Sequence, residues 1–387
     1  MKIEKMKTNF TTLYKKEPTF YIDTGGRFEI CGNHTDHNHG LCLVANCSLR
    51  IRALVNINNG NIVRVKSAGY DYFELDISDL SYKKEDRPAT KAILRGILFK
   101  LKESGYKIGG FDAYITSEIP DGGGVSSSAA VESLFGYIVS YLFNNGKITP
   151  LTIAQIGKFS ENNYFKKPSG LLDQIGTTFD SSNYIDFKDT TNPVIETLPF
   201  DLPLTLYLIK SEGDHSNLTP LYAAIPNSMY KVANLLEGKN FLRECDTKDI
   251  NRRIDELECT NEEKRKAKHF FIENQNVLDA KKAILEHDVE AFLKAIRKSQ
   301  DSSFRNLENT YVKGEFEGSP QDIIETVTNF IQDHGAIRIH GGGFKGTVLA
   351  FIKNDFVSEF DKFVQEKYAS KYYKVVISPK AVNFKKL

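Results

Sequence analysis

Residues 26–40 read GRFEICGNHTDHNHG, a run that holds three histidines, two carboxylates and one arginine. The flanking segments 27–31 and 41–57 are rich in apolar residues and are predicted to be strands, so the histidine-rich part forms the loop between them. Such a loop can serve as a metal site, as an acid/base centre, or as a set of hydrogen-bonding groups that holds a polar small molecule. The run alone leaves these three alternatives open.

The rest of the chain mixes strand-like and helix-like segments. Further strands are predicted at 111–115, 204–209, 336–339, 347–352 and 374–377, and helices at 150–165, at 355–368 and over most of 226–300. The turn sequence NNGN at 58–61 predicts a hairpin that returns through a strand at 62–65. Strands and helices in each half indicate an α+β protein of two domains, residues 1–200 and 201–387, with a cleft available between them.

Composition and charge limit the classes of partner. The 387 residues carry a net charge of +1, so no basic field favours nucleic acid. The N-terminus is charged throughout and nowhere do 18 apolar residues run together, so we expect neither export nor a membrane partner. The five cysteines form no CxxC pair. We therefore expect a cytoplasmic protein, with a monomer as the default.

A second polar motif joins a predicted strand to a predicted helix. Residues 122–130 read GGGVSSSAA, in which the glycines allow backbone N–H groups to approach a ligand closely. The following helix would add its unpaired N–H groups and the positive end of its dipole, which favours phosphate. No P-loop sequence is present. A flexible turn followed by a run of N-cap serines is the alternative.

A third motif, HGGGFKG at 340–346, again places a glycine-rich turn between apolar segments. Two such turns about two hundred residues apart suggest one split site, in which one turn holds phosphates and the other shapes the wall around them. A hairpin-like corner is the alternative. Two carboxylates elsewhere carry little signal by themselves, since Asp173 fits a helix N-cap and Glu161 fits a solvated helix position.

Four motifs in this order resemble those of one family. Residues 26–40 are similar to the galactokinase signature, in which Gly-Arg precedes a strand and Gly-Glu-His-Thr-Asp-Tyr-Asn-x-Gly follows. The runs GGGVSSSAA, SGLLDQIG and HGGGFKG resemble the other motifs of the GHMP small-molecule kinases, with weaker similarity at 218–222 and 265–273. The resemblance covers nearly the whole chain and implies the two-domain GHMP kinase fold, with the active site in the cleft between the domains.

The resemblance implies an enzyme that uses MgATP to phosphorylate the anomeric hydroxyl of galactose, giving galactose 1-phosphate and ADP. Arg27 matches the active-site arginine, which would neutralise charge on the transferred phosphoryl group and lower the pKa of the attacking hydroxyl. Asp173 matches the residue usually assigned as catalytic base. A neighbouring Arg27 would keep the pKa of Asp173 low, so base and orienter both stay open as its role.

The other matched residues divide by ligand. Those implied to bind the sugar are Asn33, His34, Asp36, Gly170 and Tyr222. Those implied to hold the phosphates of ATP are Gly122, Gly123, Gly124, Ser126, Ser127 and Ser128, and the implied ligands of Mg²⁺ are Ser128 and Glu161. The charged carboxylate of Asp36 is expected to accept strong hydrogen bonds from two neighbouring sugar hydroxyls.

The chain departs from the signature at four positions: the glutamate is Asn33, the proline before Gly-Arg is Gly25, the tyrosine after HTD is His37, and a glycine is His39. In the family the glutamate helps to bind the C6 end of the sugar. Its loss would allow a uronic acid, although Asn33 can still hydrogen-bond a 6-hydroxyl. Galactose therefore ranks first, and another hexose or a uronic acid is the alternative.

Two further alternatives come from other classes. A zinc site at His34, His37 and His39 would lack a fourth ligand at a recognisable spacing, and it would leave the glycine turns unexplained. A non-catalytic, sugar-responsive regulator would not require the Arg27 and Asp173 that the chain retains.

Overall fold

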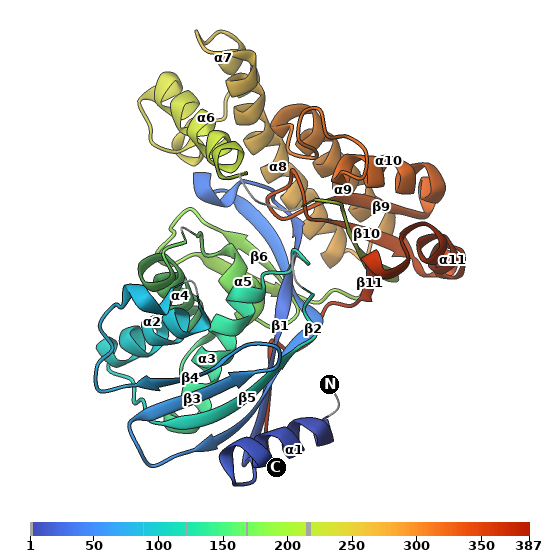
Figure 1. The fold of residues 1–387 in the computed structure, drawn as a ribbon. Helices are drawn as coiled ribbons and strands as arrows, with labels where there is room; N and C mark the ends of the chain where they lie inside the picture. Colours follow the sequence, from blue (N-terminus) through green and yellow to red (C-terminus); the bar gives the residue numbers. More distant parts are fainter. Residues whose placement is uncertain (1–2, 88, 121–122, 168, 214–217) are drawn as a thin grey trace.

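The computed structural model describes residues 3–87, 89–120, 123–167, 169–213 and 218–387 (Figure 1). Within these ranges the chain has an α+β architecture, as predicted. The strands of the larger sheet are β1 Phe20–Cys31, β2 Leu41–Ile57, β3 Ile62–Ser67, β4 Tyr72–Asp76, β5 Phe111–Ser117, β6 Ser182–Asp186, β7 Val194–Leu198 and β12 Val382–Lys386. They are ordered β12-β1-β2-β5-β3-β4, with β6 paired to β2 and β7 to β6.

The smaller sheet is antiparallel and is ordered β11-β8-β10-β9. Its strands are β8 Leu204–Lys210, β9 Gly335–His340, β10 Thr347–Lys353 and β11 Tyr372–Val375. The predicted strands at 204–209, 336–339 and 347–352 are confirmed, and the one predicted at 374–377 begins and ends two residues earlier.

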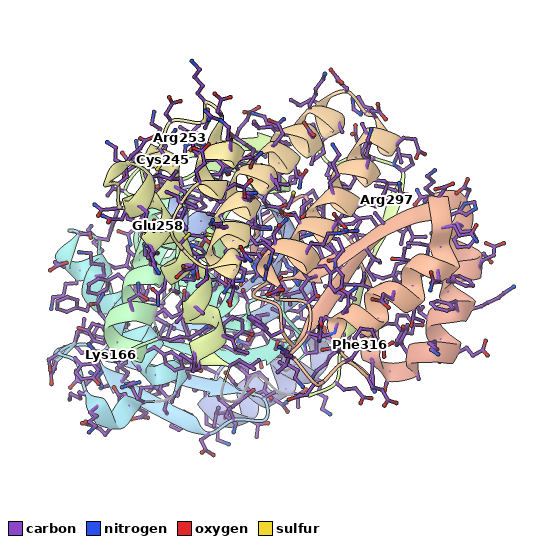
Figure 2. The ribbon with its side chains drawn as sticks, turned by 90° about the horizontal axis from the view of Figure 1, so that it is seen from above. Lys166, Cys245, Arg253, Glu258, Arg297 and Phe316 are labelled. Carbon is purple, nitrogen blue, oxygen red and sulfur yellow. The ribbon has the colours of Figure 1, made fainter. Side chains whose placement is uncertain are left out.

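The helices lie in two groups (Figure 1). Those of the first half are α1 Ile3–Tyr14, α2 Thr90–Glu103, α3 Ser127–Phe143, α4 Pro150–Ser160 and α5 Leu172–Thr178. Those of the second half are α6 Thr219–Glu237, α7 Ile250–Asp255, α8 Asn261–Leu285, α9 Val289–Ser302, α10 Pro320–Ile331 and α11 Val357–Tyr368. The second group is seen from above in Figure 2, with Arg253 and Arg297 well apart across it. Among the described residues, no helix is both long and apolar enough to cross a bilayer.

One hydrophobic core extends through both sheets. It includes Phe28 of β1 and Leu134 of α3, together with Phe292 of α9 and Leu349 of β10. The strand period of two sorts the side chains of β8: its leucines face this core, while its other apolar residues face a second cluster under α10 and α11. The long strands β1 and β2 run from the larger sheet up to the helices of the second half (Figure 1). They carry the 26–40 run between the two halves.

The predicted hairpin between β2 and β3 is wrong. The strand β5 lies between them, antiparallel to β2 and parallel to β3. The turn at 58–61 instead crosses the start of β5, where the Asn58 backbone N–H donates to the carbonyl of Gly110 at 3.1 Å. The buried strand β5 takes the central position, and the half-exposed β3 takes a place nearer the edge. The turn residues therefore predicted the reversal of the chain, whereas the burial of the strands determines which one pairs with β2.

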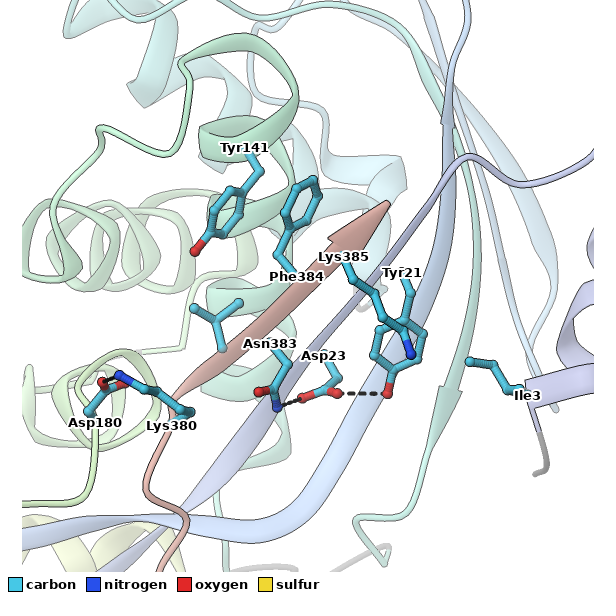
Figure 3. Close-up of a pocket in the computed structure, with 10 residues that line it drawn as sticks. Ile3, Tyr21, Asp23, Tyr141, Asp180, Lys380, Asn383, Phe384 and Lys385 are labelled. Atoms are coloured by element: carbon cyan, nitrogen blue, oxygen red, sulfur yellow. Dashed lines mark hydrogen bonds and ion pairs between the residues drawn. The ribbon is translucent and has the colours of Figure 1, made fainter. Parts of the chain in front are cut away.

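The last strand returns to the first half. β12 pairs with β1, and Asn383 donates to Asp23 at 2.9 Å beside the hydrogen bond from Tyr21 to the same carboxylate (Figure 3). Lys380 and Asp180 form a further ion pair at 2.7 Å. The boundary predicted near residue 200 stays a prediction. The smaller sheet begins at Leu204, and the final strand lies in the larger sheet.

Candidate active site

Arg27 and Asp173, 146 positions apart, form an ion pair at the centre of the molecule. Arg27 lies on β1 and its Nε donates to Oδ1 of Asp173 at 2.8 Å; Asp173 lies in the first turn of α5. The hydroxyl of Ser126 donates to the other carboxylate oxygen at 2.6 Å. Burial raises the pKa of Asp173, but the charge of Arg27 and the bond from Ser126 outweigh burial and hold that pKa below its usual value. The carboxylate is therefore ionised at neutral pH.

The second motif forms a tight turn beside this pair. Gly124 has a φ of +69° and its carbonyl accepts from Nη1 of Arg27 at 2.6 Å; a Cβ there would overlap the hydroxyl of Thr347. Ser126 is itself left-handed, with a φ of +54°, and its side chain does not cap α3. The first N–H groups of α3 therefore have no side-chain cap and are available to an anion. The predicted phosphate residue Gly122 lies outside the described residues.

The third motif faces the second across a cavity. Gly341, Gly343, Phe344 and Gly346 all have φ between +61° and +103°, so the backbone of 341–346 folds back sharply. The cavity has a volume of about 240 Å³. Its lining consists of Arg27, Ile119, Pro120, residues 123–128, Lys167, Asp173, residues 340–343 and residues 345–347. Two glycine turns from opposite halves of the chain thus form one site.

A second cavity, of about 310 Å³, adjoins the first. The two share Arg27, Lys167, Asp173, Gly341 and Gly342. The second is also lined by Glu29, Asn33, His34, Asp36, His37, Ser169, Gly170 and Leu172. The Arg27–Asp173 ion pair therefore lies at the junction of the two cavities, where a ligand in one could contact a ligand in the other.

Gly170 and Asp36 approach each other on one wall of the second cavity. A Cβ at Gly170 would lie 2.7 Å from Oδ2 of Asp36, so the glycine leaves room for this carboxylate. Burial, and after it the negative charge of Glu29, raise the pKa of Asp36 to about 6. Asp36 is therefore mostly ionised at pH 7, as expected for an acceptor of hydroxyl groups.

The histidines of the run form a chain of hydrogen bonds. Burial lowers the pKa of His34 to about 4 and that of His37 well below its usual value, so both rings are neutral. Nε2 of His34 then donates to the carbonyl of Gly342 at 2.9 Å, and Nε2 of His37 donates to Nδ1 of His34 at 3.3 Å. His39 lies apart and stacks on Phe241. Among the described residues, no group of three or more His, Cys, Asp or Glu could hold a metal ion.

Asn33 is occupied by protein contacts. Its Nδ2 donates to Oε1 of Glu29 at 2.8 Å and to the carbonyl of Gly341 at 2.7 Å, and its Oδ1 accepts from Asn309 at 2.8 Å. The side chain is 1% exposed. Both amide hydrogens are thus committed, so Asn33 cannot donate one to a ligand without breaking this network.

Tyr222 lies behind the third motif. Its hydroxyl donates to the carbonyl of Gly343 at 3.1 Å, and a Cβ at Gly342 would lie 2.7 Å from its ring. It is not among the residues that line either cavity. Tyr222 is therefore placed to support the turn.

Side chains of helix α8 bind the backbone at the start of the loop that follows β1. Oε1 of Glu273 accepts from the backbone N–H of Gly32 at 2.9 Å and from that of Asn33 at 3.1 Å. His269 donates through Nε2 to the carbonyl of Asn33 at 2.8 Å, with the Ser302 hydroxyl on its other nitrogen. These two side chains, which belong to the 265–273 motif, hold both sides of the loop backbone.

Glu161 stands next to Ser128. It is 2% exposed, and its Oε1 accepts from the Ser128 hydroxyl at 3.1 Å and from Nζ of Lys167 at 2.9 Å. Its Oε2 accepts from Gln174 at 3.0 Å. Ser128 lines the first cavity, whereas Glu161 lies behind it.

Glu29 and Lys167 are among the lining residues for which the sequence predicted no role. Glu29 lies two positions after Arg27 on the same strand, so the period of two could have placed both side chains on one face. Lys167 carried no such signal, because only the fold brings it to both cavities.

Comparison with known proteins shows which families this chain resembles. The family model for the GHMP kinases N terminal domain matches residues 90–181, and the model for the galactokinase galactose-binding signature matches residues 8–57. Galactokinases of Clostridium perfringens and Streptococcus suis are each 28% identical to the chain, over 95% of its length and 94% of theirs. That of Streptococcus thermophilus is 27% identical with the same coverage.

Solved structures share the fold. The galactokinase of Lactococcus lactis, crystallised with galactose, superposes over 100% of both chains with a TM-score of 0.82 at 22% identity. The mevalonate kinase of Methanococcus jannaschii covers 93% of this chain and 98% of its own, with a TM-score of 0.67 at 14% identity. The chain therefore has the GHMP kinase fold, matches the galactokinase galactose-binding signature at residues 8–57, and is similar to galactokinases over nearly its whole length.

Proposed function

We propose that this protein transfers the γ-phosphoryl group of ATP to the anomeric hydroxyl of galactose, giving galactose 1-phosphate and ADP. The observation that carries the proposal is the Arg27–Asp173 pair at the junction of two adjoining cavities. One cavity is walled by two glycine turns and a helix N-terminus, which suit phosphates. The other is walled by carboxylates and neutral imidazoles, which suit hydroxyl groups.

In this scheme the sugar hydroxyl lies beside Asp173 and the γ-phosphate lies beside Arg27. The guanidinium neutralises charge that develops on the transferred group. Asp173 accepts the hydrogen bond of the attacking hydroxyl and takes up its proton as the new bond forms. Because the pKa of Asp173 is held low, its larger contribution is to orient the hydroxyl in line with the phosphorus.

Mg²⁺ belongs to the proposal as the partner of ATP. The hydroxyl of Ser128 and the carboxylate of Glu161 lie 3.1 Å apart and offer the hard oxygen ligands that this ion takes, with substrate phosphates completing its shell. When bound, the ion would neutralise phosphate charge. Lys167, which pairs with Glu161, lines the same cavity and would offer its positive charge to the phosphates.

The remaining assignments follow from the same scheme. Asp36 and His34 contact the sugar, Gly170 shapes its pocket, and the turn at 123–128 holds the phosphates, with Ser127 at the first turn of α3. A reducing compartment such as the cytoplasm suits the five free cysteines. Tyr222 supports the turn at 341–343 and Asn33 bonds to Gly341 of the same turn, so both help to shape the sugar cavity.

The test is release of ADP with a panel of free sugars. Galactose should give the highest kcat/KM, and product analysis should place the phosphate on the anomeric oxygen. If no neutral sugar in the panel supports ADP release, the proposal fails, and sugar binding measured by calorimetry would then indicate a sensor.

A further inference from the structure

The second cavity holds a carboxylate for which the proposed mechanism has no use. Glu29 is 5% exposed and lines this cavity. Its Oε1 accepts from Asn33 at 2.8 Å and faces the guanidinium of Arg338 at 3.4 Å. Among the described residues, its Oε2 has no hydrogen-bond partner. A largely buried carboxylate with one committed oxygen and one free oxygen is a preformed acceptor for a ligand.

The position of Glu29 follows from the strand. The register of β1 on β2 is unbroken from Arg27 to Glu29, so these two side chains share a face while Phe28 points into the core. Two strand residues span roughly 7 Å. The reacting oxygen lies at Arg27, so Glu29 lies about one sugar ring further along. It therefore meets the side of the ring remote from the anomeric carbon.

We propose that Glu29 determines sugar specificity, with its Oε2 accepting a hydrogen bond from the C4 or the C6 hydroxyl of the hexose. This inference rests on the proposed function and deepens it. Asn33 then acts as a positioning residue, since its amide holds the other oxygen of Glu29 in place. The chain thus has a carboxylate in the sugar cavity although position 33 is an amide.

The charges around Glu29 exclude a uronic acid. Apart from Arg27, Lys167 and Asp173, which this cavity shares with the first, its charged lining residues are the carboxylates Glu29 and Asp36, and the rings of His34 and His37 are neutral. The guanidinium of Arg338 lies behind the wall, fully buried, and divides its charge between Glu29 and Glu273. A carboxylate at C6 would meet these two carboxylates at the end of the cavity remote from the shared cations Arg27 and Lys167. We therefore expect neutral hexoses as substrates.

The experiment pairs one variant with three sugars. Glu29→Gln keeps the size of the side chain and an acceptor for Asn33 but removes the charge. We expect its kcat/KM for galactose to fall about tenfold to hundredfold, since hydrogen bonds to charged groups contribute on this scale. The other two sugars are 4-deoxygalactose and 6-deoxygalactose, and one of them lacks the hydroxyl that Glu29 contacts. For that sugar, the substitution should lower kcat/KM by only about threefold or less.

A structural role for Glu29 predicts a different pattern. If the variant only disturbed Asn33, all three sugars would lose activity equally, and that result would overturn the inference. Unchanged kinetics with galactose would also overturn it. Glu118→Gln is the matched control and should change nothing, since Glu118 is an exposed carboxylate that pairs with Arg52 on the neighbouring strand β2.

Wild-type protein gives a second test that needs no stable variant. It should use one of the two deoxy sugars about tenfold to hundredfold less well than galactose, and it should not turn over galacturonate. Equal use of galactose and both deoxy sugars, or turnover of galacturonate, refutes the assignment of Glu29 and leaves the kinase reaction standing. Absence of turnover with every sugar refutes the kinase reaction itself.

Discussion

Sugar capture should weaken as the pH falls from 7 to 5, because Asp36 becomes protonated in that range. Burial and the charge of Glu29 raise the pKa of Asp36 to about 6. A protonated carboxyl loses the charge that makes it a strong acceptor of sugar hydroxyls. Activity toward galactose should therefore be gained as the pH rises through about 6 and lost below it.

The size of the effect follows from the pKa. A group with a pKa of about 6 is roughly nine-tenths ionised at pH 7 and one-tenth ionised at pH 5, so kcat/KM for galactose should fall about tenfold. His34, His37 and Asp173 keep their protonation states in this window. The pKa of His34 is about 4, that of His37 is lower still, and that of Asp173 lies below its usual value.

The assay measures ADP in quenched samples between pH 5 and 8, so that no coupling enzyme meets low pH. Glu29→Gln removes the second cause of the shift and should move the midpoint to lower pH. Asp36→Asn should remove this limb of the profile. A wild-type profile that is flat from pH 5 to 7, or a midpoint near 6 that survives in Asp36→Asn, would refute the reasoning.

Three substitutions test the rest of the site. Asp173→Asn should lower kcat by about a hundredfold or more with little change in the KM for galactose, and a change below about threefold would contradict its role. Gly124→Ala should raise the KM for ATP, because the new Cβ would clash with Thr347 and the backbone φ of +69° would be strained. The control is Gly69→Ala, where φ is +86° and the space is open; it should cost only roughly 1–2 kcal/mol of stability. Glu273→Gln should raise the KM for galactose and lower the free energy of unfolding by about 3 kcal/mol, because it weakens the hydrogen bonds to the backbone of Gly32 and Asn33. The control, Glu286→Gln at an exposed carboxylate, should change neither quantity. Equal effects of the two substitutions would refute this role of Glu273.

Much of the fold was predictable because apolar periodicity is a local property. The strands at 41–57 and 347–352 show it in the sequence itself, and both form as predicted. Strand pairing was not predictable in the same way. The turn at 58–61 predicted a hairpin, but β5 arrives from about fifty residues further on and pairs with β2; it is buried along nearly its whole length, whereas β3 is only partly buried. Partner choice depends on the whole sheet, so no local motif reports it.

The candidate site, like the fold, was predictable only in part. The resemblance to the family motifs predicted that Arg27 and Asp173 act together, and the fold brings them within 2.8 Å. The sequence could not show that the amide hydrogens of Asn33 are committed to Glu29 and to a backbone carbonyl. It also could not show Lys167 at the junction of the cavities. Hydrogen-bond satisfaction depends on neighbours far along the chain, so these contacts required coordinates.

The histidines of the 26–40 run now have a physical explanation. Burial keeps the rings of His34 and His37 neutral, so at pH 7 they neither carry charge nor titrate, and they relay hydrogen bonds to the turn at 341–343. Away from the residues shared with the first cavity, the charge comes from two carboxylates, Asp36 on the loop and Glu29 on the strand that leads to it. Neutral rings beside these groups add donors and acceptors without attracting an anionic ligand. This combination of neutral imidazoles and charged carboxylates suits the binding of a polar, uncharged molecule next to the phosphates of a nucleotide.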